Sequence, residues 1–205
     1  MLNKSIATIV LGLAITSVSF DASARRSSNQ SGGAFGNVIK NNNITAEEVK
    51  AAQEAWGKAL VQISQDYEKA GRSKAVETAN AVLDAAYGYA EGPVLFKPTL
   101  THGEQTFRTE RDGALAYFVG GNSKFPNDGG FALKGWKKFE YKNSAVYING
   151  DVALTMGNVM LTDKSGNVTT VDKTWAFKKG ADGRVKIVLH HSSLPYSPPT
   201  AISAK

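Results

Sequence analysis

The chain of 205 residues contains no cysteine and only three histidines. Without cysteine there can be neither a disulfide nor a thiolate ligand, so the hydrophobic core alone must stabilise the fold. The histidines are His102, His190 and His191. A three-histidine zinc site would need all three to converge, yet adjacent residues of a strand face opposite ways and no H-x-H or H-E-x-x-H spacing occurs. The sequence therefore predicts no metal site and no cofactor.

Other absences exclude further classes of function. The net charge is +6, but the basic residues are scattered and no basic run is interleaved with aromatics, so we expect no nucleic-acid partner. The pair Gly120 and Gly121 lacks the spacing of a phosphate-binding loop, and no nucleophile-elbow motif accompanies the serines near His190. No segment after residue 24 is apolar for long enough to cross a membrane.

The N-terminus has the pattern of a secretory signal peptide. Lys4 supplies a positive charge, residues 6–15 form an apolar run, and Ala22 and Ala24 flank Ser23 as a small-x-small cleavage site. We expect residues 1–24 to be removed and the mature protein to be periplasmic, with no membrane contact after cleavage. An uncleaved membrane anchor is the alternative.

Composition divides the remainder of the chain. Residues 25–43 are rich in serine, glycine and asparagine and poor in apolar residues, which predicts a flexible leader. Residues 44–197 contain the periodic patterns of one domain, and residues 198–205 form a C-terminal tail. The sequence shows no internal repeat and no second domain.

Helical patterns occupy the first half of this domain. Thr45 and Glu48 form a capping box, and apolar residues then recur every three or four positions as far as Gly71. A second helix is predicted after Ser73 and ends within residues 88–92. A short third helix is predicted over residues 114–119 and ends at a glycine pair.

The second half has the period of two that is typical of strands. Asn149 and Gly150 give the strongest hairpin signal. Residues 94–100 form either a short strand or an extended link, and Pro98 excludes them from the centre of a sheet. We expect an α+β fold in which helices cover one face of a bent sheet of four antiparallel strands, at residues 136–148, 152–161, 168–177 and 185–193.

The last of these strands places polar groups on both faces of the sheet. Alternation puts Lys186, Val188, His190 and Ser192 on one face and His191 on the other. By itself this pattern is equally compatible with a core strand that runs into a polar tail.

The string His-His-Ser-Ser-Leu-Pro at residues 190–195, together with the order of elements, resembles the iota class of carbonic anhydrases. The resemblance covers residues 44–195. It implies an NTF2-like cone related to the association domain of calmodulin-dependent kinase, with long N-terminal helices packed on a strongly curved antiparallel sheet. It also implies an export signal, homodimers formed through the sheets, and reversible hydration of CO2 to bicarbonate.

The same resemblance assigns the catalytic residues to Thr99, Tyr117, His190 and Ser192. Thr101 lies two positions from Thr99 and is an alternative pocket hydroxyl. The class has been described both without a metal and with zinc or manganese, and the histidine spacing of this chain favours the metal-free form. His190 would accept or relay a proton, while the three hydroxyls would bind a water and then the bicarbonate oxygens.

Two other classes of function fit the same fold. A small-molecule isomerase or dehydratase would need a carboxylate base inside the pocket, and neither Asp112 nor Asp172 can be assigned to that position. A binding or oligomerisation module without catalysis would have no need for these four polar side chains in a buried site.

Overall fold

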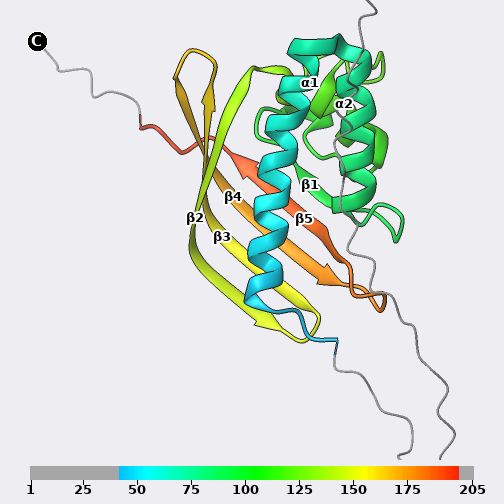
Figure 1. Cartoon of the computed structure of the whole chain (residues 1–205), viewed down its shortest axis with the longest axis vertical. Coiled ribbons are helices and arrows are strands. Elements are labelled where there is room, and N and C mark those ends of the chain that lie inside the picture. The colour runs from blue at the N-terminus through cyan, green and yellow to red at the C-terminus, as the bar shows by residue number, and fades with distance from the viewer. Residues whose placement is uncertain (1–41, 199–205) are drawn as a thin grey trace, which may run out of the picture. The chain divides into compact units, whose positions relative to one another are not determined.

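The computed structural model describes residues 42–198, which belong to one compact unit. The predicted signal peptide, most of the predicted leader and most of the tail lie outside the described residues. Figure 1 shows two helices on one side of a strongly curved sheet. The elements in chain order are α1 (Ala46–Ala86), β1 (Leu95–Lys97), η1 (Gly103–Gln105), α2 (Arg111–Val119), η2 (Phe131–Leu133), β2 (Trp136–Asn149), β3 (Val152–Asp163), β4 (Val168–Lys179) and β5 (Val185–Ser193).

Helix α1 begins at the predicted capping box. The Thr45 side chain accepts a hydrogen bond from the backbone N–H of Glu48 at 3.2 Å, and the Glu48 carboxylate accepts one from Thr45 N–H at 2.9 Å. Gly71 interrupts the helix with φ 78° and ψ −174°, a conformation that glycine adopts without steric cost. The two predicted helices therefore meet directly at Gly71, and the intervening loop is a single residue.

The sheet contains the four predicted antiparallel strands and one more. Its order is β1-β5-β4-β3-β2, and β1 pairs in parallel with β5 at the edge. The edge position agrees with the expectation from Pro98, which directly follows β1. Register shifts interrupt the β2–β3 and β4–β5 ladders, and such bulges increase the local bend of a strand. The expected α+β cone is confirmed.

The core lies between α1 and the concave face of the sheet. Trp56, Leu60 and Ile63 of α1 are buried at helical spacing and belong to the same hydrophobic core as Leu161 of β3 and Phe177 of β4. A Cβ atom on Gly57 would lie 2.0 Å from the Phe139 ring, so glycine is required for this approach of helix and sheet. None of the helices in residues 42–198 is long and apolar enough to span a bilayer.

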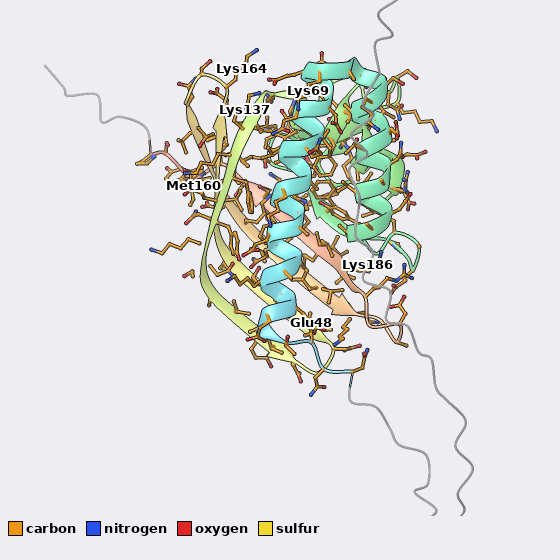
Figure 2. All side chains as sticks on the ribbon, viewed as in Figure 1. Glu48, Lys69, Lys137, Met160, Lys164 and Lys186 are labelled. Atoms are coloured by element: carbon orange, nitrogen blue, oxygen red, sulfur yellow. The ribbon has the colours of Figure 1, made fainter. Side chains whose placement is uncertain are left out.

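The predicted face assignment in β5 is correct at its end and wrong at its start. His190 and Ser192 are both buried and His191 is exposed, as alternation requires. A register shift between Ala176 and Phe177 changes the alternation, so that Ile187 instead of Val188 joins the buried core with His190. Lys186, labelled in Figure 2, donates hydrogen bonds to the carbonyls that end α1.

Candidate active site

The structure brings two predicted site residues into direct contact. Thr99, two residues beyond β1, and Ser192 of β5 are buried, and their hydroxyl oxygens lie 2.7 Å apart. The parallel pairing of β1 with β5 brings the chain segment after β1 to this end of β5. The Thr101 hydroxyl instead donates to the carbonyls of Pro98 and Thr106 within its own loop. Thr99 is therefore the threonine that meets Ser192.

Tyr117 of α2 supplies a third buried hydroxyl. Its oxygen makes no hydrogen bond of standard geometry with any other described residue. Burial raises the pKa of Tyr117, while interactions with the Thr99 side chain and with the backbone of Thr99 and Leu100 act in the opposite direction. The phenol thus lies beside the Thr99–Ser192 pair and remains protonated, able to donate a hydrogen bond.

A cavity of about 260 Å³ reaches Tyr117 from the surface. Asp128 also lines this cavity, but its carboxylate forms a buried ion pair with Arg108 at 3.0 Å. The cavity is lined by Leu100, Tyr117, Asn127, Asp128, Gly129, Gly130, Phe131 and Lys134. Of the three site hydroxyl residues, Tyr117 alone lines this cavity, and its hydroxyl oxygen is itself buried.

His190 occupies the same face of the sheet, but both of its ring nitrogens have protein partners. Nδ1 lies 2.8 Å from the Tyr87 hydroxyl and Nε2 lies 2.7 Å from Lys173 Nζ. The ring also stacks on Phe96, with centroids 4.6 Å apart. Burial, and to a smaller extent the nearby Lys173 and His191, hold the pKa of His190 well below its usual range. The imidazole is therefore neutral at pH 7.

Sequence reasoning missed the residues that hold His190. Trp56 of α1 donates its indole N–H to the Tyr87 hydroxyl at 2.9 Å, and Tyr87 follows α1 directly. Both belong to the apolar stripes of the predicted helices, where an aromatic is normally explained by packing alone. Lys173 had a usable signal, because it is the only charged residue among the inward positions Val171, Lys173, Trp175 and Phe177 of β4.

The remaining histidine and the two candidate carboxylates lie away from these groups. His102 precedes η1 and is exposed, and Asp112 is exposed at the start of α2. Asp172 is exposed and accepts a hydrogen bond from Asn158. Within residues 42–198, no three histidine, aspartate or glutamate side chains are grouped so as to hold a metal ion.

Fold and site together define a class of protein. The chain is an α+β cone with three buried hydroxyls, a neutral histidine and a cavity lined in part by Tyr117, an arrangement suited to acid–base chemistry on a small molecule. Residues 47–194 match the model of the family "Metal-independent carbonic anhydrase". This chain belongs to that family, and it is a carbonic anhydrase that works without a metal.

Individual relatives agree with this assignment. A metal-independent carbonic anhydrase from Nostoc sp. (strain PCC 7120) is 58% identical over 158 residues, which are 77% of each chain. A crystal structure of an iota-carbonic anhydrase from a cyanobacterium, complexed with bicarbonate, is 56% identical with a TM-score of 0.77, and the match covers 80% of this chain and 99% of that one. The expected family, fold class and metal independence are thereby confirmed.

A more distant similarity was found to a protein from Xanthomonas campestris described as a calcium/calmodulin-dependent protein kinase II association domain. It is 22% identical with a TM-score of 0.46, and the match covers 80% of this chain and 95% of that one. This similarity is too weak to support an argument about function.

Proposed function

We propose that this chain hydrates CO2 at the cluster formed by the hydroxyls of Thr99, Tyr117 and Ser192. The observation that carries the proposal is the Tyr117 phenol, which is buried beside the Thr99–Ser192 pair and makes no hydrogen bond of standard geometry with residues 42–198. A buried donor in that state is free to bind an oxygen of water or bicarbonate. The related cyanobacterial enzyme was crystallised as a complex with bicarbonate, which supports the same substrate here.

In this mechanism the hydroxyls perform the work that zinc performs in other carbonic anhydrases. They orient a water so that a lone pair of its oxygen faces the carbon of CO2. The new C–O bond forms as one water proton leaves, and hydrogen bonds from the hydroxyls stabilise the negative charge that develops on the CO2 oxygens. The product is bicarbonate, and the released proton must leave the site.

His190 acts as a relay in this proposal. Because both ring nitrogens are engaged, the imidazole can transfer a proton only by accepting one at one nitrogen while releasing one from the other. A neutral ring is the form that can begin such a transfer. The aromatic side chains of Trp56, Phe96 and Trp175 surround the ring and exclude bulk water from it.

The test is CO2 hydration by stopped flow on the full chain after removal of metals. We expect Ser192→Ala and Tyr117→Phe each to lower kcat/KM by at least tenfold, with circular dichroism spectra like that of the wild type. Full activity in both variants would refute the hydroxyl mechanism while leaving the family membership intact. An isomerase or dehydratase function is not favoured, because Asp112 and Asp172 are exposed and Asp128 is paired with Arg108.

We also propose that the protein is a homodimer formed through the outer face of the sheet. One apolar row crosses all five strands in register, formed by Leu95, Leu189, Ala176, Leu154 and Tyr147. Leu95 is 61% exposed and Tyr147 63% exposed, and a second copy would cover them. Analytical ultracentrifugation should find a dimer for the wild type and a monomer for Leu154→Lys. A monomeric wild type would refute this proposal.

Finally, we propose that the protein acts in the periplasm. The proposal is supported by the signal-peptide pattern of residues 1–24, which lies outside the described residues. Cell fractionation and N-terminal sequencing should find a periplasmic protein that begins at Arg25. An intact Met1 in a membrane fraction would instead support the uncleaved anchor.

A further inference from the structure

Lys173 is a buried lysine whose amine has one close polar partner in the structure. It lies on β4 directly opposite Ser192 of β5 in the strand register, and it is 5% exposed. Its Nζ atom is 2.7 Å from His190 Nε2. The indole rings of Trp56 and Trp175 lie near the same nitrogen, with centroids at 4.7 and 5.4 Å. The amine is thus placed between the histidine and two aromatic faces.

No carboxylate neutralises this lysine. None of the ion pairs found within residues 42–198 involves Lys173, and burial is the cause that lowers its pKa to about 7. Other titratable groups around the Lys173–His190 pair come from α2, β1, β5 and the residue after α1, and none of them is a carboxylate: Tyr117, Lys97, His191 and Tyr87. A proton on Lys173 would therefore lack a counter-charge.

Counting hydrogen-bond donors and acceptors indicates independently that the Lys173 amine is neutral. The Tyr87 oxygen accepts the Trp56 N–H, so its own hydrogen has His190 Nδ1 as the acceptor within reach. His190 then carries its hydrogen on Nε2 and must donate it to Lys173, which requires a lone pair on Nζ. With a charged Lys173 the imidazole hydrogen would move to Nδ1, and the buried Tyr87 hydroxyl would lose its acceptor.

We propose that Lys173, as a neutral amine, is the positioning residue that fixes His190 as the Nε2–H tautomer. The hydrogen bonds then run in one direction, from Trp56 to Tyr87 to His190 to Lys173, and each of these four side chains has a hydrogen-bond partner. This inference rests on the proposed role of His190 in proton transfer and deepens it. Lys173 acts through His190, and nothing in the proposal requires it to touch CO2.

Protonation of Lys173 would reverse the arrangement. Nζ gains a proton and becomes a donor to Nε2, Nε2 gives up its hydrogen, and Nδ1 takes one and donates to the Tyr87 oxygen. The number of protons on the imidazole is unchanged, but its tautomer is the opposite one. We expect this change to follow the titration of Lys173 and to reduce CO2 hydration as the pH falls below about 7.

The experiment combines ¹⁵N NMR of the histidine rings with pH–rate profiles of the full chain. In the wild type we expect the Nε2–H tautomer of His190 at pH 8.5 and a tautomer change at lower pH. Lys173→Met keeps the length of the side chain and removes the amine, and it should abolish the tautomer change and lower kcat at least tenfold at pH 8.5. Lys178→Met on the exposed face of β4 is the matched control and should behave as the wild type.

Two results would overturn the proposal. One is an Nδ1–H tautomer of His190 in the wild type at pH 8.5, a measurement that needs no variant and no assay. The other is a Lys173→Met protein whose pH–rate profile keeps the shape of the wild-type profile, which would reduce Lys173 to a packing role. If Ser192→Ala and Tyr117→Phe stay fully active while the tautomer is as expected, the hydroxyl mechanism fails and the assignment for Lys173 stands.

Discussion

The hydroxyl oxygens of Thr99 and Ser192 lie 2.7 Å apart, although the two residues are 93 positions apart in the sequence. Each buried hydroxyl is the hydrogen-bond partner of the other. Removing one therefore leaves the other buried without a partner, which lowers the free energy of unfolding. Thr99→Val keeps the shape of the side chain, and we expect it to lower the free energy of unfolding by about 1–3 kcal/mol. Urea unfolding measures this change.

The variant that combines Thr99→Val with Ser192→Ala completes a double-mutant cycle with the two single variants. Because it removes both partners, we expect it to be less destabilised than the sum of the two single variants. Additive losses within about 0.3 kcal/mol would show that the two hydroxyls do not depend on each other.

Tyr117→Phe should separate activity from stability. The phenol makes no hydrogen bond of standard geometry with another described residue, so the variant should unfold close to the urea concentration at which the wild type unfolds. Loss of a donor to developing charge typically costs about 2.7–4 kcal/mol in the barrier, so CO2 hydration should fall by at least tenfold. Tyr89→Phe removes a hydroxyl that bonds the Arg108 carbonyl and serves as the control with near wild-type turnover.

His190 and His191 are adjacent but differ in environment. His190 is buried between Tyr87 and Lys173, whereas His191 is exposed on the other face of the sheet. We expect His190→Gln to lower kcat at least tenfold. An imidazole can accept a proton at one ring nitrogen and release one from the other, whereas the glutamine amide cannot. His191→Gln should remain within about twofold of the wild type in the same assay. Equal losses in both variants would contradict the relay role of His190.

Metal removal should leave the enzyme active. The chain belongs to a family of metal-independent carbonic anhydrases, so dialysis against a chelator should not change CO2 hydration. Metal analysis of the same sample shows how complete the removal is. Activity that is lost on dialysis and returns with zinc or manganese alone would contradict this expectation.

The stability of the fold should rise with pH through the titration of Lys173. Burial lowers its folded pKa to about 7 from the ordinary value of 10.5, so between these values the unfolded chain binds the extra proton. One such proton changes the free energy of unfolding by about 1.4 kcal/mol per pH unit, in favour of the folded state as the pH rises. Over pH 7.5–9 the wild type should therefore gain stability relative to Lys173→Met. A difference in the free energy of unfolding between the two proteins that stays constant over this pH range would contradict the lowered pKa of Lys173.

Much of the fold follows from local patterns. The capping box at Thr45 and Glu48, the break at Gly71 and the turn at Gly150 are decided by a few neighbouring residues, and each occurs where the sequence predicts it. The alternation of inward and outward side chains along β4 is equally local. The bulge in β5 is not, because it depends on the pairing of β5 with β4, and this explains the wrong face assignment for Val188.

By itself the sequence determined the order of helices and strands, the shared face of His190 and Ser192, and the ending that indicates the family. These features depend on spacing along one segment, which the chain displays directly. Only the tertiary structure decided that Thr99 instead of Thr101 meets Ser192, and that Tyr87 and Lys173 hold the two nitrogens of His190. Such contacts join strands and helices far apart in the chain, and their geometry is set by the curvature and register of the sheet.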